Sequence, residues 1–279
     1  PVLVFKDLEN KRFIGGALSI AKNISSFCNK VKVISMVGDK DEYRQYILNN
    51  LEKNISAQFV KKKNSPTILK KRYVDIISKN KLLGVYKLND ETLNKIEENQ
   101  VINFLNKFKN KFDLIIVADY GHGFLTKKII NNIQKKGKFI SANSQLNSFN
   151  KGYHDLNKYI NSDCMVINDS EIRYELRDRQ NKIEVLMRKL KKKMKIKYLI
   201  VTRGSEGAII LDKNNKFFYS DAYASNVVDK VGAGDNLFAV SSLLLSNKVD
   251  NNLSLLSGSI AAALNVENFG NSTISKNKI

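Results

Sequence analysis

A glycine-rich turn that ends in an aspartate is the segment of this chain best suited to chemistry. Residues 229–235 read Asp-Lys-Val-Gly-Ala-Gly-Asp, and the apolar residues that follow are typical of a helix. Amide groups at a helix start favour an anion, and glycine lets the backbone approach it closely. A carboxylate here would repel phosphate, so we expect Asp235 to take a proton from an attacking hydroxyl. The amides of Gly232, Ala233 and Gly234 would hold the charge on a transferred phosphoryl group.

An ordinary strand-to-helix turn is the alternative interpretation of the same residues. Asp235 would then lie in the first turn of a helix, where the helix dipole favours an acid. Asp229 is expected to accept an Asx-type hydrogen bond within the turn. The turn alone leaves both interpretations open.

Apolar segments of strand length alternate along the chain with segments of helical periodicity. The apolar run at 112–118 is typical of a parallel strand that is buried on both faces. Further strands are expected at 31–37, 138–142, 164–167 and 198–201, a hairpin at 208–219, and helices at 41–50, 91–109, 127–136, 235–246 and 253–265. This alternation predicts the α/β class, with a doubly wound parallel sheet.

Polar residues follow four of the predicted strands. They are Asp119, Asn143, Asn168 and Thr202. Ligands of doubly wound sheets bind beyond the carboxyl ends of the strands. We therefore expect these four side chains to converge on one site.

Two half-polar strands are expected at 67–73 and 81–88. They predict a small β-sheet lid over the site, formed mainly by residues from about 1–13 and 58–90, with an opening strand at Val2–Phe5. A sheet of two or three strands is marginal without a surface to pack on. We therefore expect the lid to pack against its copy in a two-fold homodimer.

Four motifs in this chain resemble the signatures of the ribokinase-like, phosphofructokinase-B-type carbohydrate kinases. Residues 229–235 resemble the D-x-x-G-A-G-D signature, and residues 15–21 resemble the Gly-Gly-Ala turn that opens a helix against the sugar. Residues 168–171 match N-x-x-E, and residues 202–204 resemble the T-x-G nucleotide turn. The motifs occur in the family's order and extend over nearly the whole chain, which implies a ribokinase-like domain over 1–279.

Three further segments are similar to the heptose-phosphate kinases that make ADP-heptose precursors. They are residues 67–72, 119–123 and 265–272. The resemblance implies an ATP-dependent kinase, with ATP and Mg2+ as cofactors and a hydroxyl of a sugar or sugar phosphate, such as heptose 7-phosphate, as acceptor. Lid-to-lid dimers are frequent in this family, which agrees with the homodimer expected above.

Substrate contacts are implied at four positions. Gly15 and Gly16 would let the sugar approach the backbone, while Arg72 and Asp119 would contact the sugar or its phosphate. Arg72 also suits an ordinary position on the lid surface. Asp119 also suits a structural role at the end of its strand.

Nucleotide contacts are implied at five positions. Asn168 and Glu171 would order water around Mg2+, with Glu171 reaching the metal through water. Their spacing also fits a helix capping box. Thr202 and Gly204 would touch the phosphates and Asn265 would border the adenine, although a strand-ending turn and a packed helix also explain these residues.

Composition narrows the function classes further. The chain has 279 residues, 43% of them hydrophobic, and a formal net charge of +20. Most basic residues are lysines without interleaved aromatics, which disfavours nucleic-acid binding. The positive potential instead helps to attract anionic nucleotide and sugar phosphate. Cys28 and Cys164 form no C-x-x-C motif, and no apolar run reaches membrane-spanning length, so a reducing cytoplasm is expected.

Two other nucleotide-binding classes lack their motifs here. A dinucleotide-dependent oxidoreductase needs G-x-G-x-x-G after its first strand, but Leu237 stands where the third glycine would be. A P-loop enzyme needs G-x-x-x-x-G-K-[S/T], which the sequence does not contain.

The resembled family has a first core strand and a substrate-binding acid before the Gly15-Gly16 turn. Neither is found in the sequence given, so we expect this to be a truncated or partial chain. A nucleotidyltransferase domain often follows the kinase in the heptose relatives. The alternative function is therefore a catalytically weak or regulatory kinase-like half of a bifunctional sugar-nucleotide synthase.

Overall fold

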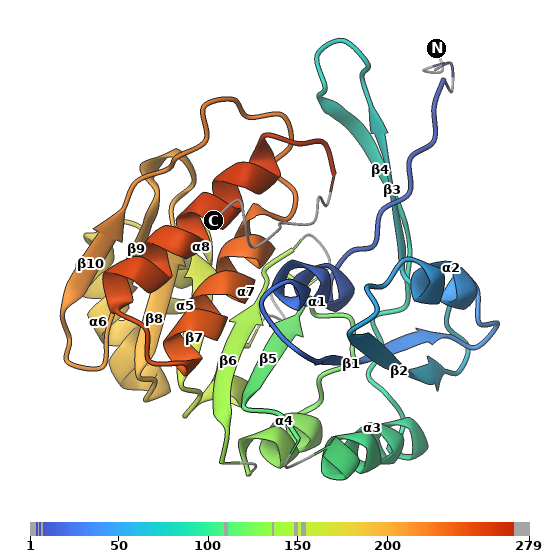
Figure 1. The fold of residues 1–279 in the computed structure, drawn as a ribbon, viewed down its shortest axis with the longest axis horizontal. Helices are drawn as coiled ribbons and strands as arrows, with labels where there is room; N and C mark the ends of the chain where they lie inside the picture. Colours follow the sequence, from blue (N-terminus) through green and yellow to red (C-terminus); the bar gives the residue numbers. More distant parts are fainter. Residues whose placement is uncertain are drawn as a thin grey trace.

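The computed structural model describes residues 4, 6, 8–108, 111–135, 137–147, 150–151 and 155–270. Within them, a six-stranded sheet has the order β10-β9-β8-β7-β6-β5 (Figure 1). The strands are β5 (Leu114–Asp119), β6 (Phe139–Ser144), β7 (Cys164–Asn168), β8 (Tyr198–Thr202), β9 (Ala208–Leu211) and β10 (Phe217–Ser220). β5 to β8 are parallel, and the β9–β10 hairpin is antiparallel at one edge. The predicted α/β class and parallel sheet are confirmed.

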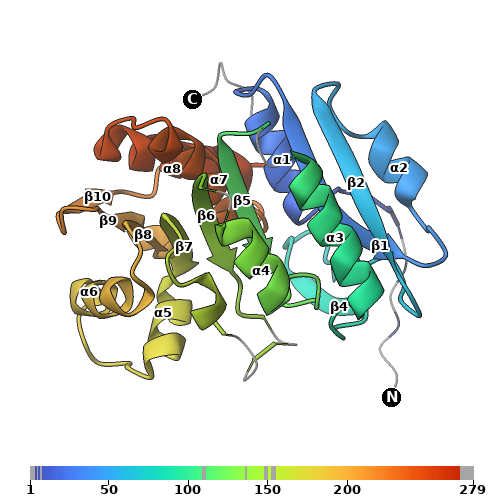
Figure 2. The same cartoon turned by 90° about the horizontal axis from the view of Figure 1, so that it is seen from below.

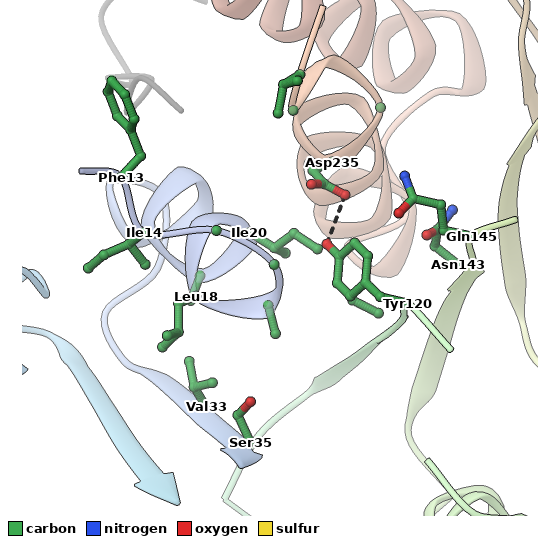
Figure 3. A pocket seen from close by; sticks show the side chains of 18 of the residues that line it. Phe13, Ile14, Leu18, Ile20, Val33, Ser35, Tyr120, Asn143, Gln145 and Asp235 are labelled. Carbon is green, nitrogen blue, oxygen red and sulfur yellow. Dashed lines mark hydrogen bonds between the residues drawn. The ribbon is translucent and has the colours of Figure 1, made fainter. Parts of the chain in front are cut away.

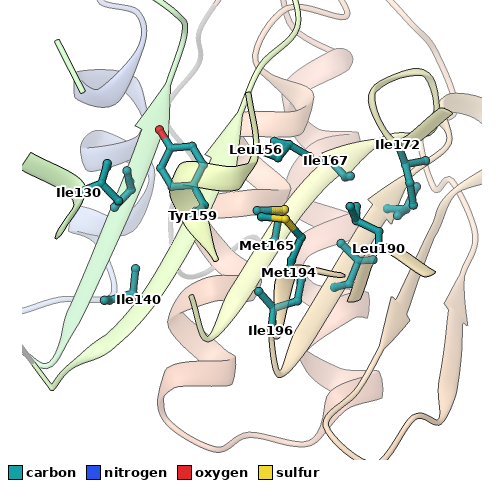
Figure 4. Close-up of a cluster of buried hydrophobic side chains, with 14 of the residues drawn as sticks. Ile130, Ile140, Leu156, Tyr159, Met165, Ile167, Ile172, Leu190, Met194 and Ile196 are labelled. Carbon is teal, nitrogen blue, oxygen red and sulfur yellow. The ribbon is translucent and has the colours of Figure 1, made fainter. Parts of the chain in front are cut away.

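Helices cover both faces of this sheet (Figure 2). One face carries α1 (Ala17–Ser25), α7 (Ala233–Ser246) and α8 (Asn251–Val266), and the other carries α3 (Lys95–Phe108), α4 (Lys127–Gln134), α5 (Asp169–Leu176) and α6 (Ile183–Met194). Alternation along β7 explains the two layers, because side chains of a strand alternate between the faces of its sheet. Met165 and Ile167 pack with α4, α5 and α6 (Figure 4), whereas Cys164 and Val166 pack with α1, α7 and α8. A strand buried on both faces reads as a continuous apolar run.

A separate two-stranded parallel sheet lies beside β5. It consists of β1 (Val31–Gly38) and β2 (Ile55–Lys62), with Val31 opposite Ile55. The strand β2 is absent from the sequence prediction, which assigned residues from about 58 onward to the lid, although Ile55, Ala57 and Phe59 alternate with polar residues. The helix between them, α2, extends only over Arg44–Asn49 and not over 41–50, since Asp41 and Tyr43 both have positive φ.

The lid hairpin consists of β3 (Leu69–Val74) and β4 (Lys81–Lys87), which pair antiparallel and project from the rest of the molecule (Figure 1). It is smaller than the predicted lid, because 58–62 belong to β2 and 8–14 have no regular secondary structure. The strand predicted at Val2–Phe5 lies outside the described residues except for position 4.

A large cavity separates the β1–β2 sheet from β5 and continues beneath the lid hairpin. Its volume is about 2140 Å3. Apolar side chains line its lower part, among them Val33 on β1 and Ile116 on β5. Most of the predicted site residues line its upper part, but Ala233, Gly204 and Asn265 do not. No helix in the described part of the chain is long and apolar enough to cross a membrane.

Candidate active site

The predicted convergence at the carboxyl ends of the strands is confirmed. Asp119 and Asn168 are the last residues of β5 and β7, Thr202 ends β8, and Asn143 is next to last in β6. All four line the cavity. Figure 3 shows Asn143 on the same side of the cavity as Asp235.

The glycine turn leads directly into α7. Gly232 has φ 89° and ψ −9°, a left-handed conformation that favours glycine, and the helix begins at Ala233. The first hydrogen bond from an amide to Gly232 O comes from Asn236, at 2.9 Å. The preceding amides of the first turn have no acceptor within the helix. Gly234 borders the cavity, and a Cβ added there would meet no atom within 4 Å. The turn therefore has the open amide groups that an anion hole requires.

Asp235 lies in the first turn of α7 and lines the cavity. Burial raises the pKa of its carboxyl from 3.8 to about 6, while the hydrogen bond from Tyr120 and the charge of Lys70 oppose that rise in pKa. A general base works best when its pKa is near the working pH. The position and pKa of Asp235 are those that the predicted proton acceptor would need.

Tyr120 is a site residue that the sequence prediction did not include. It directly follows β5, and its hydroxyl donates a 3.0 Å hydrogen bond to Asp235 Oδ1 (Figure 3). Its ring lies against Gly16, where a Cβ would be 3.5 Å from Tyr120 Cε2. Gly16 has φ 61° and precedes α1, while both Gly15 and Gly16 line the cavity. The expected glycine turn therefore stands opposite Asp235, with Tyr120 between them.

The lid hairpin contributes two cations to the same cavity. Lys70 and Arg72 lie on one face of β3 and both contact the ring of Tyr86, at 5.7 and 5.8 Å from its centroid. Burial lowers the pKa of Lys70, an effect that the nearby charge of Arg72 increases and that Asp90 and Asp235 oppose. Lys70 was not among the predicted site residues, although it lies in the segment that resembles the heptose-phosphate kinases.

Asp119 lines the cavity, but its carboxylate has protein partners on both oxygens. Oδ1 accepts a hydrogen bond from Gly121 N at 2.9 Å. Oδ2 accepts one from the Tyr159 hydroxyl and forms an ion pair with Lys158. These contacts account for a buried acid at this position and favour its structural role over substrate contact.

Asn168 and Glu171 form the capping box that their spacing allows. Asn168 Oδ1 accepts from Glu171 N, and Glu171 Oε2 accepts from Asn168 N, both at 2.8 Å. Glu171 Oε1 also accepts from Leu146 N at 2.9 Å, and Glu171 is only 2% exposed. No group of three His, Cys, Asp or Glu residues that could hold a metal ion occurs in the described residues. These hydrogen bonds show that the pair caps α5, and its part in ordering water around Mg2+ stays a prediction.

We expect Glu171→Gln to lower the free energy of unfolding by about 1–3 kcal/mol, because an amide group would then face a buried backbone N–H. We also expect it to raise the Mg2+ concentration needed for half-maximal activity. Thermal melts and Mg2+ titrations measure the two effects. Thr126→Ala is the control, since it removes the cap of α4 at a distance from this site. An unchanged Mg2+ titration with a lowered melting temperature would leave Glu171 with the capping role alone.

Thr202 and Gly204 lie beyond the end of β8. Thr202 lines the cavity. Gly204 has φ 61° and begins a 3-10 turn, and a Cβ added there would meet nothing within 4 Å. Both positions are compatible with contact to a nucleotide.

Asn265 does not border the cavity, which corrects the expectation that it contacts adenine. Its side chain is fully buried, with Nδ2 donating to Val231 O at 2.8 Å and Oδ1 accepting from Asn236 at 2.9 Å. Both polar groups of the amide are therefore used to hold α8 against the glycine turn and the start of α7. Asn265 thus bonds to residues on both sides of Asp235 in the sequence, Val231 and Asn236.

Asp229 forms the expected Asx-type turn, since its Oδ1 accepts from Val231 N at 3.0 Å. The same oxygen forms a 2.7 Å ion pair with Lys81 at the start of β4. Oδ2 accepts from Gly270 N at 3.3 Å. One buried carboxylate thus joins the glycine turn to the lid hairpin.

The parallel sheet, the lid hairpin and the acid after a glycine turn together define a ribokinase-like sugar kinase. The model of the pfkB family of carbohydrate kinases matches residues 7–278. The chain therefore belongs to this family and is a phosphotransferase.

Two relatives similar to this chain over nearly its whole length are both bifunctional HldE proteins. The chain is 28% identical over 284 residues to the bifunctional protein HldE of Campylobacter jejuni, covering 100% of this chain and 58% of the relative. It is 29% identical over 279 residues to the HldE of Histophilus somni, covering 99% of this chain and 56% of the relative. The chain thus spans less than two thirds of the length of either relative.

Solved structures confirm the fold. Phosphofructokinase-2 of Escherichia coli, in complex with potassium, superimposes with a TM-score of 0.75 at 15% identity, covering 99% of this chain and 90% of that one. Ribokinase of Thermotoga maritima gives 0.71 at 17% identity, covering 94% and 83%.

Proposed function

We propose that this kinase transfers the γ-phosphoryl group of ATP to a hydroxyl of a sugar phosphate, with heptose 7-phosphate as the favoured acceptor. Asp235 takes the proton of the acceptor hydroxyl. The amides of Gly232, Ala233 and Gly234 hold the charge on the phosphoryl group. The lid hairpin covers the acceptor and limits the access of water.

One observation carries this proposal. Asp235 stands in a cavity at the start of α7 with a carboxyl pKa of about 6, beside free amides and opposite the Gly15-Gly16 turn. At an ordinary helix start, the helix dipole and water would both stabilise the ionised form of an acid and keep its pKa low. Here burial raises its pKa, which is costly for the fold and useful for a base.

The residues around the cavity fit a nucleotide with Mg2+. Carbohydrate kinases of this family use ATP, typically with Mg2+. Bound Mg2+ neutralises charge on the phosphates. Thr202 and Gly204 would contact the phosphates, while Asn168 and Glu171 would hold the outer waters of the metal.

Lys70 and Arg72 support a phosphorylated acceptor over a neutral sugar. Both cations line the cavity from the same face of β3. Lys70 is close enough to Asp235 for their charges to interact. Arginine and lysine are well suited to phosphate oxygens. The names of the HldE relatives and the resemblance to heptose-phosphate kinases favour a heptose as the sugar.

A panel of acceptors tests the proposed function. Purified protein is incubated with ATP, Mg2+ and heptose 7-phosphate, fructose 6-phosphate, ribose or no acceptor, and ADP release is measured. We expect turnover with sugar phosphates, highest with heptose 7-phosphate, and little ADP without acceptor. Binding of ATP in calorimetry without turnover on any acceptor would support the alternative of a catalytically weak kinase half.

We further propose that the lid hairpin forms a homodimer. The face of the hairpin opposite Lys70 and Arg72 carries the apolar or aromatic side chains of Leu69, Tyr73, Leu83 and Val85, and it also carries Lys71 and Lys87. Leu83 and Val85 are 51% and 50% exposed, which is unusual for large apolar residues on a sheet face. A second copy related by a two-fold axis would bury this face against itself.

Light scattering at micromolar protein tests the dimer. We expect about twice the 31.7 kDa mass of one chain, and one chain mass for Leu83→Lys, because a buried like-charge pair at a two-fold interface is unfavourable. Ile96→Lys is the control, since it adds the same charge to an exposed apolar residue on α3. A wild-type monomer would refute the stable dimer, and a Leu83→Lys dimer would place the interface elsewhere.

A further inference from the structure

Tyr120 is fixed at both ends in the centre of the site. Its carbonyl accepts a 2.7 Å hydrogen bond from Asn147 Nδ2, and its hydroxyl donates to Asp235 Oδ1 at 3.0 Å. The ring between them lies against Gly16. Neither the backbone nor the ring can shift without disturbing one of these contacts.

The hydroxyl of Tyr120 distinguishes the two oxygens of the base. Tyr120 donates its hydrogen bond to Oδ1 of Asp235. No side-chain or backbone donor in the described part of the chain bonds to Oδ2. A carboxylate held by one oxygen has a defined rotamer, because rotation would break a partly buried hydrogen bond. Oδ2 is then the oxygen left for an incoming hydroxyl.

We infer that Tyr120 is the positioning residue of the catalytic base. It holds Asp235 so that Oδ2 takes the proton of the acceptor, and its ring is the wall on which the sugar lies between Gly16 and Asp235. This inference rests on the proposed function, in which Asp235 is the base. It adds a residue that acts through Asp235 and does not itself exchange a proton.

The charged and titratable groups around Asp235 set the expected sign of the effect. Tyr120 and Lys70 both favour the ionised carboxylate and hold its pKa down against burial. Arg72 lies further along the face of β3, His122 is paired with Asp90 at 2.6 Å, and the Asp119 carboxylate is occupied by its own partners. Burial strongly raises the pKa of Tyr120 itself, and the nearby Asp235 carboxylate adds to that rise, so its hydroxyl stays protonated and remains a donor.

Loss of the hydroxyl should therefore raise the pKa of Asp235 above its value of about 6. The base must be ionised to act, so activity falls as the pH drops through this pKa. We expect Tyr120→Phe to move the acid limb of kcat/KM to higher pH by up to about one unit, a tenfold loss at a fixed pH on that limb. We also expect a lower kcat that does not recover fully at high pH, because the carboxylate loses its fixed rotamer.

The experiment compares pH profiles of wild type, Tyr120→Phe and Tyr159→Phe with the best acceptor of the panel. Tyr159→Phe is the matched control, since it removes a buried tyrosine hydroxyl bound to Asp119 and should leave the acid limb in place. ATP binding measured by calorimetry shows that each variant is folded. An acid limb of Tyr120→Phe that coincides with that of wild type would overturn the inference.

A second measurement does not depend on activity. The carboxyl of Asp235 is titrated by NMR in protein with labelled aspartate, and its signal is assigned by its loss in Asp235→Asn. We expect a higher pKa in Tyr120→Phe, and an unchanged pKa would overturn the inference. If Asp235→Asn is inactive while Tyr120→Phe titrates like wild type, the inference fails and the proposed function stands. If Asp235→Asn remains active, the proposed function fails whatever the titration shows.

Discussion

Replacing Asp235 by asparagine should lower phosphoryl transfer by about 10²–10⁴-fold, the usual contribution of a positioned general base. Asparagine has nearly the same shape, and its carbonyl oxygen can still accept the hydrogen bond from Tyr120. The loss would therefore report the missing proton acceptor and not a rearranged site. Steady-state turnover at saturating ATP and acceptor measures it.

The stability of the same variant should not fall. The carboxyl pKa of Asp235 is raised in the folded protein, so stability is lost as the pH rises from 3.8 to about 6 and stays at the lower level above that. A neutral side chain removes this cost, and we expect an equal or higher melting temperature at pH 7. Glu184→Gln, in the first turn of α6, is the control for loss of an acid at a helix start. More than a tenth of wild-type turnover in Asp235→Asn would show that another group is the base.

Gly234→Ala should give the second largest effect, with activity and stability changing in opposite directions. A methyl group at this position meets no protein atom within 4 Å, and alanine reduces the entropy of the unfolded chain by the equivalent of about 0.4–1 kcal/mol. The same methyl would project beside the amides that hold the phosphoryl group. We expect kcat/KM to fall by about 10²-fold or more, comparable to the loss of one donor from an anion hole.

Gly258 provides the opposite case, in which alanine should lower stability and leave activity unchanged. In Gly258→Ala, the new Cβ would lie 2.1 Å from Ser241 Oγ between α7 and α8, so overpacking should cost about 1–3 kcal/mol. The folded fraction should keep its activity, because Gly258 lies away from the cavity lining. Melting curves and kcat/KM for both variants complete the test. Full activity in Gly234→Ala would show that the phosphoryl group does not approach this amide.

Much of the parallel sheet could be predicted because its strands are buried on both faces. Such strands read as apolar runs, and β5, β7 and β8 were each predicted to within about two residues. β2 was missed because its apolar alternation extends over only Ile55, Ala57 and Phe59, after which Val60 changes face and two lysines follow. The strand is stabilised by its partner β1, at a distance along the chain that local patterning does not reveal.

The site could be predicted where chemistry depends on the backbone. Glycines that need positive φ, such as Gly16 and Gly232, and an acid next to them leave a pattern in the sequence. Tyr120 and Lys70 lie in segments that resemble the heptose-phosphate kinases, but their place beside Asp235 depends on how the end of β5 and the lid hairpin meet α7. Asn265 was misplaced for a related reason, since sequence alone does not show which face of α8 is toward the catalytic turn.

In the proposed function, the ion pair between Lys81 and Asp229 couples the position of the lid hairpin to the phosphate affinity of the glycine turn. Asp229 is nearly buried, so moving the lid hairpin away removes the one cation recorded beside it in the described residues and alters the field on the glycine turn. Thermodynamic coupling is reciprocal. If closing the lid raises the phosphate affinity of the turn by a given factor, bound phosphate raises the equilibrium constant for lid closure by the same factor. Salt that weakens this pair would then disfavour the closed lid and weaken nucleotide binding together.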